Sequence, residues 1–167
     1  MNDAYFAGGC FWCITPVFIE AGAERAECGY SGGAEKDPSY SEVKSQLTGH
    51  REAVRVVYDP GKVSYDTLLD AFLENVDPFD GGGQFIDRGR SYTLAVYYTS
   101  EAEKEAAAGK IGALEKAAGR KTFISVEPFV SFYPAEEEHQ HFYLKNPEAF
   151  RCELKISGRK RKLDEGK

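Results

Sequence analysis

One strand and the helix that follows it do most to constrain the fold of this chain. Residues 52–58, EAVRVVY, are rich in β-branched side chains and stop at Asp-Pro-Gly, which predicts a strand followed by a turn. Residues 64–77 begin with Ser64, a suitable N-cap, and then place apolar side chains at helical spacing. These apolar residues are Leu68, Leu69, Phe72, Leu73 and Val76. Alternating strands and helices of this kind indicate a mixed α/β or α+β domain.

The rest of the chain continues this alternation. Helices are predicted at 11–21 and 100–119, the second opened by a capping box of Ser100 and Glu103. Pro16 suits the first helix only near its first turn. Further strands are expected at 3–9, 23–33, 92–98 and 123–130, loops at 34–42 and 78–91, and a short helix or turn at 134–147. The second of these loops is long and glycine-rich, which is typical of a functional loop.

Length and composition indicate one domain. The 167 residues are 42% hydrophobic, which suits a sizeable core, and no repeat or interior linker divides them. The order of elements is compatible with both antiparallel and parallel strand pairs. We expect a folded domain over 1–152 and a polar, flexible tail over 153–167. The basic run RKRK at 159–162 is expected to be solvated with that tail.

Charge and targeting patterns narrow the function classes. The net charge of −6 argues against a nucleic-acid or anionic-membrane partner. The N-terminal residues show no signal-peptide pattern, and no apolar run approaches the ~20 residues that span a bilayer. We therefore expect a cytoplasmic protein. In that compartment the four cysteines of the chain are more typical of catalysis or metal binding than of a disulfide framework.

The stretch AGGCFWC, residues 7–13, contains the strongest candidate for a nucleophile. If a helix begins at Phe11, Cys10 lies at its N-terminal edge, where the helix dipole favours a thiolate. Gly8 and Gly9 allow a substrate to approach the sulfur closely. Phe11 and Trp12 add an apolar wall beside it. This combination suits a cysteine that attacks a small, mostly apolar group.

The pair Cys10 and Cys13 is open to other interpretations. It is compatible with a redox pair, with half of a zinc site, or with a thioredoxin-type motif, although Trp12 lies inside the pair rather than before it. A zinc-binding structural or interaction domain and a general thiol oxidoreductase are therefore the alternative functions. The further zinc ligands would come from Cys28, Cys152, His50, His139 and His141.

Six sequence blocks resemble those of one enzyme family, and they occur in its order over residues 5 to about 150. The blocks are GGCFWC (8–13), GYSGG (29–33), DPSYSEV (37–43), TGHREAVRVVYDP (48–60), GGQFIDRGRSY (82–92) and FYPAEEEHQHFYLKNP (132–147). Together they resemble the peptide methionine-(S)-sulfoxide reductase family, MsrA. The resemblance implies a catalytic domain with a two-layer sandwich or roll around a mixed sheet. It also implies reduction of methionine-(S)-sulfoxide, free or in proteins, and so a role in protein repair under oxidative stress.

The same resemblance assigns roles to individual residues. It implies that Cys10 attacks the sulfoxide sulfur, and that Phe11 and Trp12 receive the S-methyl group. Glu52 corresponds to the acid that protonates the sulfoxide oxygen. Such an acid must be neutral, which at pH 7 requires its pKa to rise by nearly three units from ~4.3, and burial against the two aromatic rings would favour this. Two tyrosines that hydrogen-bond the oxygen and an aspartate near the substrate correspond to Tyr40, Tyr92 and Asp87.

The cycle needs a second thiol to regenerate the first. Attack leaves Cys10 as a sulfenic acid, which condenses with another thiol. Our hypothesis is that Cys13, one helical turn away, is this resolving cysteine, and Cys152 is the alternative. The expected reductant is a dithiol protein such as thioredoxin, or dithiothreitol in the laboratory, and no metal or organic cofactor is expected. The remaining cysteine and histidines, Cys28, His50, His139 and His141, are interpreted as structural.

Overall fold

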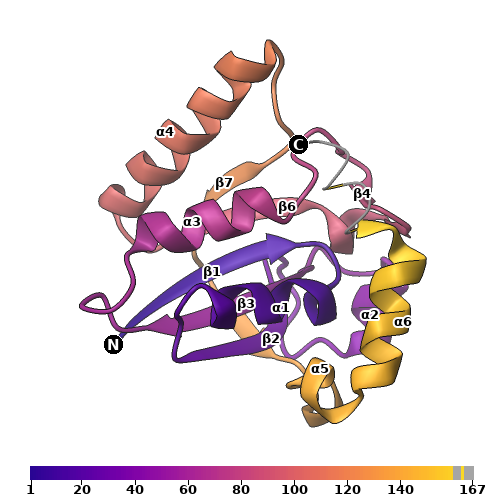
Figure 1. Cartoon of the computed structure of the whole chain (residues 1–167). Helices are drawn as coiled ribbons and strands as arrows, with labels where there is room; N and C mark the ends of the chain where they lie inside the picture. Colours follow the sequence, from indigo (N-terminus) through magenta and orange to yellow (C-terminus); the bar gives the residue numbers. More distant parts are fainter. Residues whose placement is uncertain (160–162, 164–167) are drawn as a thin grey trace.

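A six-stranded mixed sheet forms the centre of the computed structural model, which describes residues 1–159 and 163 (Figure 1). Its strands lie in the order β7-β6-β1-β3-β2-β8. β6 and β7 are parallel and the other neighbouring pairs are antiparallel, so the prediction of a mixed sheet in one domain is confirmed. The strands are β1 (Asn2–Gly8), β2 (Arg25–Ser31), β3 (Arg51–Tyr58), β6 (Leu94–Tyr98), β7 (Ser125–Pro128) and β8 (Phe132–Pro134).

The central strand β3 explains why an acidic residue enters the core. Side chains alternate between the two faces of a strand. Val54, Val56 and Tyr58 face the helices and join the main core, so Glu52 points to the same side. The alternation of side chains along β3 therefore places the carboxyl group of Glu52 beneath the helix layer.

Three helices cover this face of the sheet (Figure 1). They are α1 (Phe11–Glu20), α3 (Tyr65–Glu74) and α4 (Glu101–Ala118). α3 begins as predicted, with the Ser64 hydroxyl accepting a hydrogen bond from Thr67 N at 3.1 Å. Pro16 lies inside α1 rather than in its first turn. These helices and the sheet form the two layers that the sequence resemblance implied.

The start of α4 differs in detail from the predicted capping box. The Ser100 hydroxyl accepts a hydrogen bond from Glu103 N, as expected. The Glu103 carboxylate, however, accepts from Thr99 N at 2.8 Å instead of completing the reciprocal bond to Ser100. The cap is therefore extended by one residue.

Several short elements lie within segments that were expected to be loops. Residues 34–42 were predicted as a loop, but the helix α2 (Tyr40–Lys44) begins there. Its capping box, in which Ser39 and Glu42 satisfy each other's backbone amides, is a local signal that this prediction missed. The strands β4 (Gly83–Gln84) and β5 (Asp87–Arg88) and the start of the 3₁₀ helix η1 (Arg90–Tyr92) lie in the other predicted loop. The 3₁₀ helix η2 (Glu137–His139) and α5 (Phe142–Lys145) lie within 134–147, where a short helix or turn was expected.

The C-terminal segment is helical across the expected start of the tail. A helix, α6 (Pro147–Ser157), crosses the boundary that was placed at residue 152, and it packs against α1 and α5. Arg159, the first residue of the basic run expected to be solvated, is only 4% exposed. Residues 160–162 of that run lie outside the described residues. Within the described part of the chain, no helix is both long and apolar enough to cross a membrane.

Candidate functional site

Cys10 lies at the junction of β1 and α1, as the sequence predicted. It is the N-cap residue of α1, and its carbonyl accepts hydrogen bonds from Cys13 N and Ile14 N. Gly9 has φ of +88°, and a Cβ there would lie 2.7 Å from Gln84 Cβ. A glycine is therefore needed at this position to turn the chain from the strand into the helix without displacing β4.

Glu52 lies directly under the first turn of α1. Its Oε1 accepts a hydrogen bond of 3.0 Å from Phe11 N, and the residue is 1% exposed. Burial raises the pKa of this carboxyl to about 8, although the Phe11 amide opposes the shift. The carboxyl therefore holds its proton at pH 7, which is the state required of a proton donor.

Two tyrosines complete the polar part of the site. Tyr40 is the first residue of α2 and Tyr92 the last of η1. Burial raises the pKa of both phenols, and the charge of Glu52 raises them further. Among the described residues, neither hydroxyl has a hydrogen-bond partner. Both phenols therefore remain protonated and free to donate to a ligand.

The aromatic side of the site is larger than the sequence indicated. Trp12 stacks on Phe142, with ring centroids 4.1 Å apart, and its Nε1 donates to His139 Nδ1 at 3.1 Å. His139 stacks in turn on Tyr40 at 4.2 Å, and Phe11 lies against both rings at 5.6 and 6.2 Å. Burial lowers the pKa of His139, which favours the neutral form that accepts the indole hydrogen bond. His139 and Phe142 therefore belong to the aromatic cluster around Trp12 and Phe11.

Asp87 also lies in the site, together with a residue that the sequence reasoning missed. The Cys10 sulfur and carboxylate oxygens of Asp87 and Glu153 lie within 4.8 Å of one another. Burial, followed by the charge of Glu153, raises the pKa of Asp87. Glu153 comes from α6, so the segment expected to be a tail contributes to the site. No local sequence signal distinguishes Glu153 from a solvated glutamate.

The zinc alternative finds little geometric support. Among the described residues, no cluster of metal-binding atoms contains both Cys10 and Cys13. The cluster that includes His139 contains only glutamates besides it. His50 is occupied in the core, where its Nδ1 accepts from Gly33 N at 3.2 Å and its Nε2 donates to Glu35 O at 2.7 Å.

The two thiols of the CxxC pair differ in a way that corrects the expectation for Cys10. A hydrogen bond shared with Cys13, together with burial, raises the pKa of Cys10. The same hydrogen bond lowers the pKa of Cys13, and Arg159 lowers it further. The thiolate is therefore favoured on Cys13 in the free protein. The helix N-terminus is not sufficient to ionise Cys10, because that thiol is buried and surrounded by other acidic groups.

The other two cysteines differ strongly in environment. Cys28 is buried under α1, and its sulfur lies 3.2 Å from Thr15 Oγ1. Burial raises its pKa to about 12, which fits an inert core thiol. Cys152 is exposed on α6, next to Glu153.

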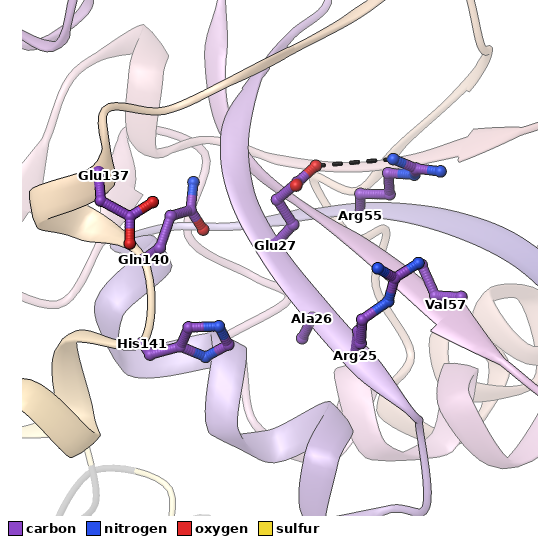
Figure 2. A pocket seen from close by; sticks show the side chains of 8 residues that line it. All are labelled: Arg25, Ala26, Glu27, Arg55, Val57, Glu137, Gln140 and His141. Carbon is purple, nitrogen blue, oxygen red and sulfur yellow. Dashed lines mark ion pairs between the residues drawn. The ribbon is translucent and has the colours of Figure 1, made fainter.

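A separate pocket of about 240 Å³ lies over β2 and β3 (Figure 2). Arg25, Glu27 and Arg55 line it together with His141, and Glu27 and Arg55 form an ion pair of 3.7 Å. None of the residues predicted for the active site lies there. His141 is exposed and has φ of +55°, so the structure places it outside the aromatic cluster.

The fold and the cluster around Cys10 define a class of thiol-dependent oxidoreductases, in which a cysteine acts beside a protonated carboxyl group. The sequence model of the family described as peptide methionine sulfoxide reductase matches residues 2–167. The chain belongs to the peptide methionine sulfoxide reductase family.

Individual relatives agree with this assignment. A protein from Bacillus velezensis, described as peptide methionine sulfoxide reductase MsrA, is 44% identical over 97% of this chain and 93% of its own length. The structure of reduced Mxr1 from Saccharomyces cerevisiae has a TM-score of 0.83 at 29% identity and covers 88% of this chain and 86% of that chain. Methionine sulfoxide reductase A of Corynebacterium diphtheriae has a TM-score of 0.79 at 30% identity, over 87% and 75% of the two chains.

Another structure of the yeast protein holds it in complex with Trx2. It covers 83% of each chain, with a TM-score of 0.57 at 20% identity, and it adds only a likeness of fold.

Proposed function

We propose that this chain reduces methionine-(S)-sulfoxide, free or in proteins, to methionine, with Cys10 as the nucleophile. The observation that carries the proposal is the protonated carboxyl of Glu52, buried beneath the helix turn that begins at Cys10. A sulfoxide sulfur becomes electrophilic only when its oxygen is protonated or strongly hydrogen-bonded. The site supplies a carboxylic acid and two free phenols for that oxygen.

The aromatic cluster accounts for substrate orientation. Phe11 and Trp12 provide an apolar surface for the S-methyl group beside the sulfur of Cys10, and His139 holds the indole in place through its hydrogen bond. With the methyl group on this side, the oxygen points toward Glu52, Tyr40 and Tyr92. One epimer of the sulfoxide fits this arrangement, because the other exchanges the positions of oxygen and side chain.

The first step transfers oxygen between two sulfurs. Cys10 attacks the sulfoxide sulfur while Glu52 donates a proton to the oxygen. The attack forms a bond between the two sulfurs, and this bond breaks as the oxygen passes to Cys10. The sulfur–oxygen bond of the substrate is thereby lost, a sulfur–oxygen bond is formed on Cys10, and the thiol proton restores the carboxyl group. The methionine sulfur gains two electrons, Cys10 loses two, and Cys10 is left as a sulfenic acid.

The second step closes the cycle through Cys13. Condensation of the Cys10 sulfenic acid with the Cys13 thiol forms a disulfide and releases water. The side-chain hydrogen bond between these residues supports Cys13 over the exposed Cys152 as the partner. Mass spectrometry of peptides after one turnover would identify the bond, and a link from Cys10 to Cys152 would contradict this assignment.

A dithiol protein such as thioredoxin would then reduce the disulfide. The complex of yeast Mxr1 with Trx2 supports a partner of this type. All electrons in this scheme pass through thiols, so no metal or organic cofactor is needed. We place the reaction in the cytoplasm, since the dithiol state that begins each cycle persists in a reducing compartment.

The separated S and R epimers of a blocked methionine sulfoxide test the proposal directly. Consumption of each epimer is measured with dithiothreitol as reductant, for the wild type and for Cys10→Ser. We expect wild type to reduce only the S epimer and Cys10→Ser to reduce neither. Reduction of both epimers, or activity in the folded Cys10→Ser variant, would contradict the proposed nucleophile or its stereochemistry.

A further inference from the structure

The end of α6 places a buried arginine beside the cysteine pair. Gly158 has φ of +70°, a conformation that favours glycine, and it turns the chain back toward the domain after α6. Arg159 follows, and its guanidinium donates to Gly8 O at 3.0 Å and to Asn75 O at 2.7 Å. The side chain thus reaches the end of β1, two residues before Cys10.

This guanidinium is buried and shares a side-chain hydrogen bond with Cys13. Its other two acceptors are neutral carbonyls, and it lies over the ring of Phe85 at 4.6 Å. Among the described residues, its Nε has no hydrogen-bond partner although it is buried. A buried cation is costly unless an anion lies near it. The acidic groups that act on it are the thiols of Cys13 and Cys10 and the carboxyl of Asp87.

Arg159 and Cys13 line the same cavity. Its volume is about 470 Å³, and its apolar walls include Val17 of α1 and Leu154 of α6. Cys13 is the third residue of α1, where the helix dipole also favours an anion. Arg159, which follows α6, therefore lies near the thiol of Cys13 in the first turn of α1.

The charges around Cys13 act in opposite directions. Its hydrogen bond with Cys10 and the charge of Arg159 lower its pKa. Burial and the carboxylates of Glu153, on α6, and Asp87, on β5, raise it. Arg159 is a cation of the described part of the chain that opposes these two carboxylates at this thiol.

We propose that Arg159 is a positioning residue for the second half of the reaction, where it holds Cys13 as a thiolate next to the sulfur of Cys10. The inference rests on the proposed role of Cys13 as resolving cysteine. The thiolate attacks the sulfur of the Cys10 sulfenic acid, the sulfur–sulfur bond forms and the sulfur–oxygen bond breaks. The leaving hydroxide takes a proton from solvent and departs as water. The Cys13 sulfur is oxidised and the Cys10 sulfur is reduced, one electron each.

The pH dependence of Cys13 alkylation tests this without any substrate. In a Cys10→Ser background, the modified peptides are resolved by mass spectrometry, which separates Cys13 from Cys28 and Cys152. Arg159→Gln should raise the midpoint of Cys13 alkylation by about one pH unit or more, because it removes an adjacent positive charge. Arg159→Lys, which keeps the charge, should recover part of the shift.

Arg151→Gln is the matched control, since it removes an exposed arginine from α6, the helix that ends just before Arg159. It should leave the midpoint of Cys13 alkylation unchanged from that of the Cys10→Ser protein. Equal midpoints in Arg159→Gln and Arg151→Gln would overturn the proposal. If Arg159→Gln does not fold, the Cys13 alkylation midpoint of the Cys10→Ser protein decides. A midpoint below the ~8.5 of a free thiol supports the proposal, and one at or above it overturns the proposal.

A second measurement follows the sulfenic acid itself in proteins that retain Cys10. After one turnover at pH 7, dimedone should trap the Cys10 sulfenic acid for about ten times longer in Arg159→Gln than in Arg151→Gln, because a pH unit is a tenfold change in thiolate. This difference should shrink toward pH 9. A difference independent of pH would contradict the thiolate role. Failure of sulfoxide reduction altogether would refute the proposed function but leave the alkylation result standing, so the two are distinguishable.

Discussion

The backbone amide of Phe11 and the carboxyl of Glu52 are joined by a hydrogen bond of 3.0 Å, 41 residues apart in sequence. This bond ties the first turn of α1 to the central strand and fixes the carboxyl beside Cys10. Because the carboxyl is buried, its pKa is raised to about 8 in spite of the bond. One contact therefore places the proposed nucleophile and the proposed proton donor together.

Replacement of Glu52 by Gln should reduce the rate of the first turnover by about 10²–10⁴-fold, the usual contribution of a general acid. The amide has no acidic proton to give, yet its oxygen still accepts from Phe11 N. In wild type the rate should also fall as pH rises above about 8, where the carboxyl ionises. Single-turnover methionine formation from pH 6 to 9 measures both effects. A fall above pH 8 that persists in Glu52→Gln would assign this titration to another group.

The raised pKa of Glu52 also predicts a pH-dependent cost in stability. Below about pH 4.5 the carboxyl is protonated in the folded and unfolded states alike, and between 4.5 and 8 only the folded state keeps the proton. Rising pH therefore favours unfolding over this window, by roughly 3–5 kcal/mol in total, and has no further effect above it. Urea unfolding at pH 5, 7 and 8.5 should show Glu52→Gln gaining stability relative to wild type with increasing pH. A constant difference would contradict the shifted pKa.

Tyr40→Phe and Tyr92→Phe should each lower kcat/KM by about 10–100-fold, because each removes one donor to the sulfoxide oxygen. The double variant should lose more than either single one. Tyr98→Phe is a suitable control, since this tyrosine lies at the end of β6 with Lys104 over its ring and away from Cys10. Steady-state assays with the S epimer provide the comparison. If either single variant matches Tyr98→Phe, that hydroxyl does not contact the oxygen.

Cys13→Ser should complete one turnover but lose sustained activity with thioredoxin as reductant. Cys152→Ser should retain it, because the exposed Cys152 does not share the hydrogen bond that joins Cys10 and Cys13. The assay is methionine release per enzyme, first without reductant and then with a thioredoxin system. The opposite pattern, with activity lost only in Cys152→Ser, would make Cys152 the resolving cysteine.

Gly9→Ala should destabilise the protein by about 1–3 kcal/mol, because φ is +88° and the new Cβ would lie 2.7 Å from Gln84 Cβ. It should also reduce activity, since Gly9 sets the approach of the chain to Cys10. Gly109→Ala is the matched control: it lies within α4 with no atom within 4 Å of the added Cβ, and should stabilise by about 0.5–1 kcal/mol. Denaturant unfolding of both variants checks these signs. If Gly9→Ala left the free energy of unfolding unchanged, β4 would have to move aside for the added Cβ at little cost.

Patterns that involve neighbours in sequence were enough to predict much of this molecule. A run of β-branched residues that stops at Asp-Pro-Gly indicated the central strand, and the apolar spacing after Ser64 indicated α3. The residues around Cys10 pointed to a thiol nucleophile in the same way. Glu52, Tyr40 and Tyr92 were identified through resemblance to a known family, and each of them interacts electrostatically with Cys10 in the structure.

The sequence by itself therefore determined the elements and the candidate chemistry, because caps, turns and periodicity depend on residues a few positions apart. The tertiary structure alone decided the environment of each group. It brought Arg159 and Glu153, expected in a solvated tail, next to residues near the opposite end of the chain. It also placed Cys10 and Cys13 in a shared hydrogen bond that raises the pKa of Cys10 and lowers that of Cys13. The burial of a group and the charges that act on it depend on its neighbours in space, and most of those neighbours are remote in sequence.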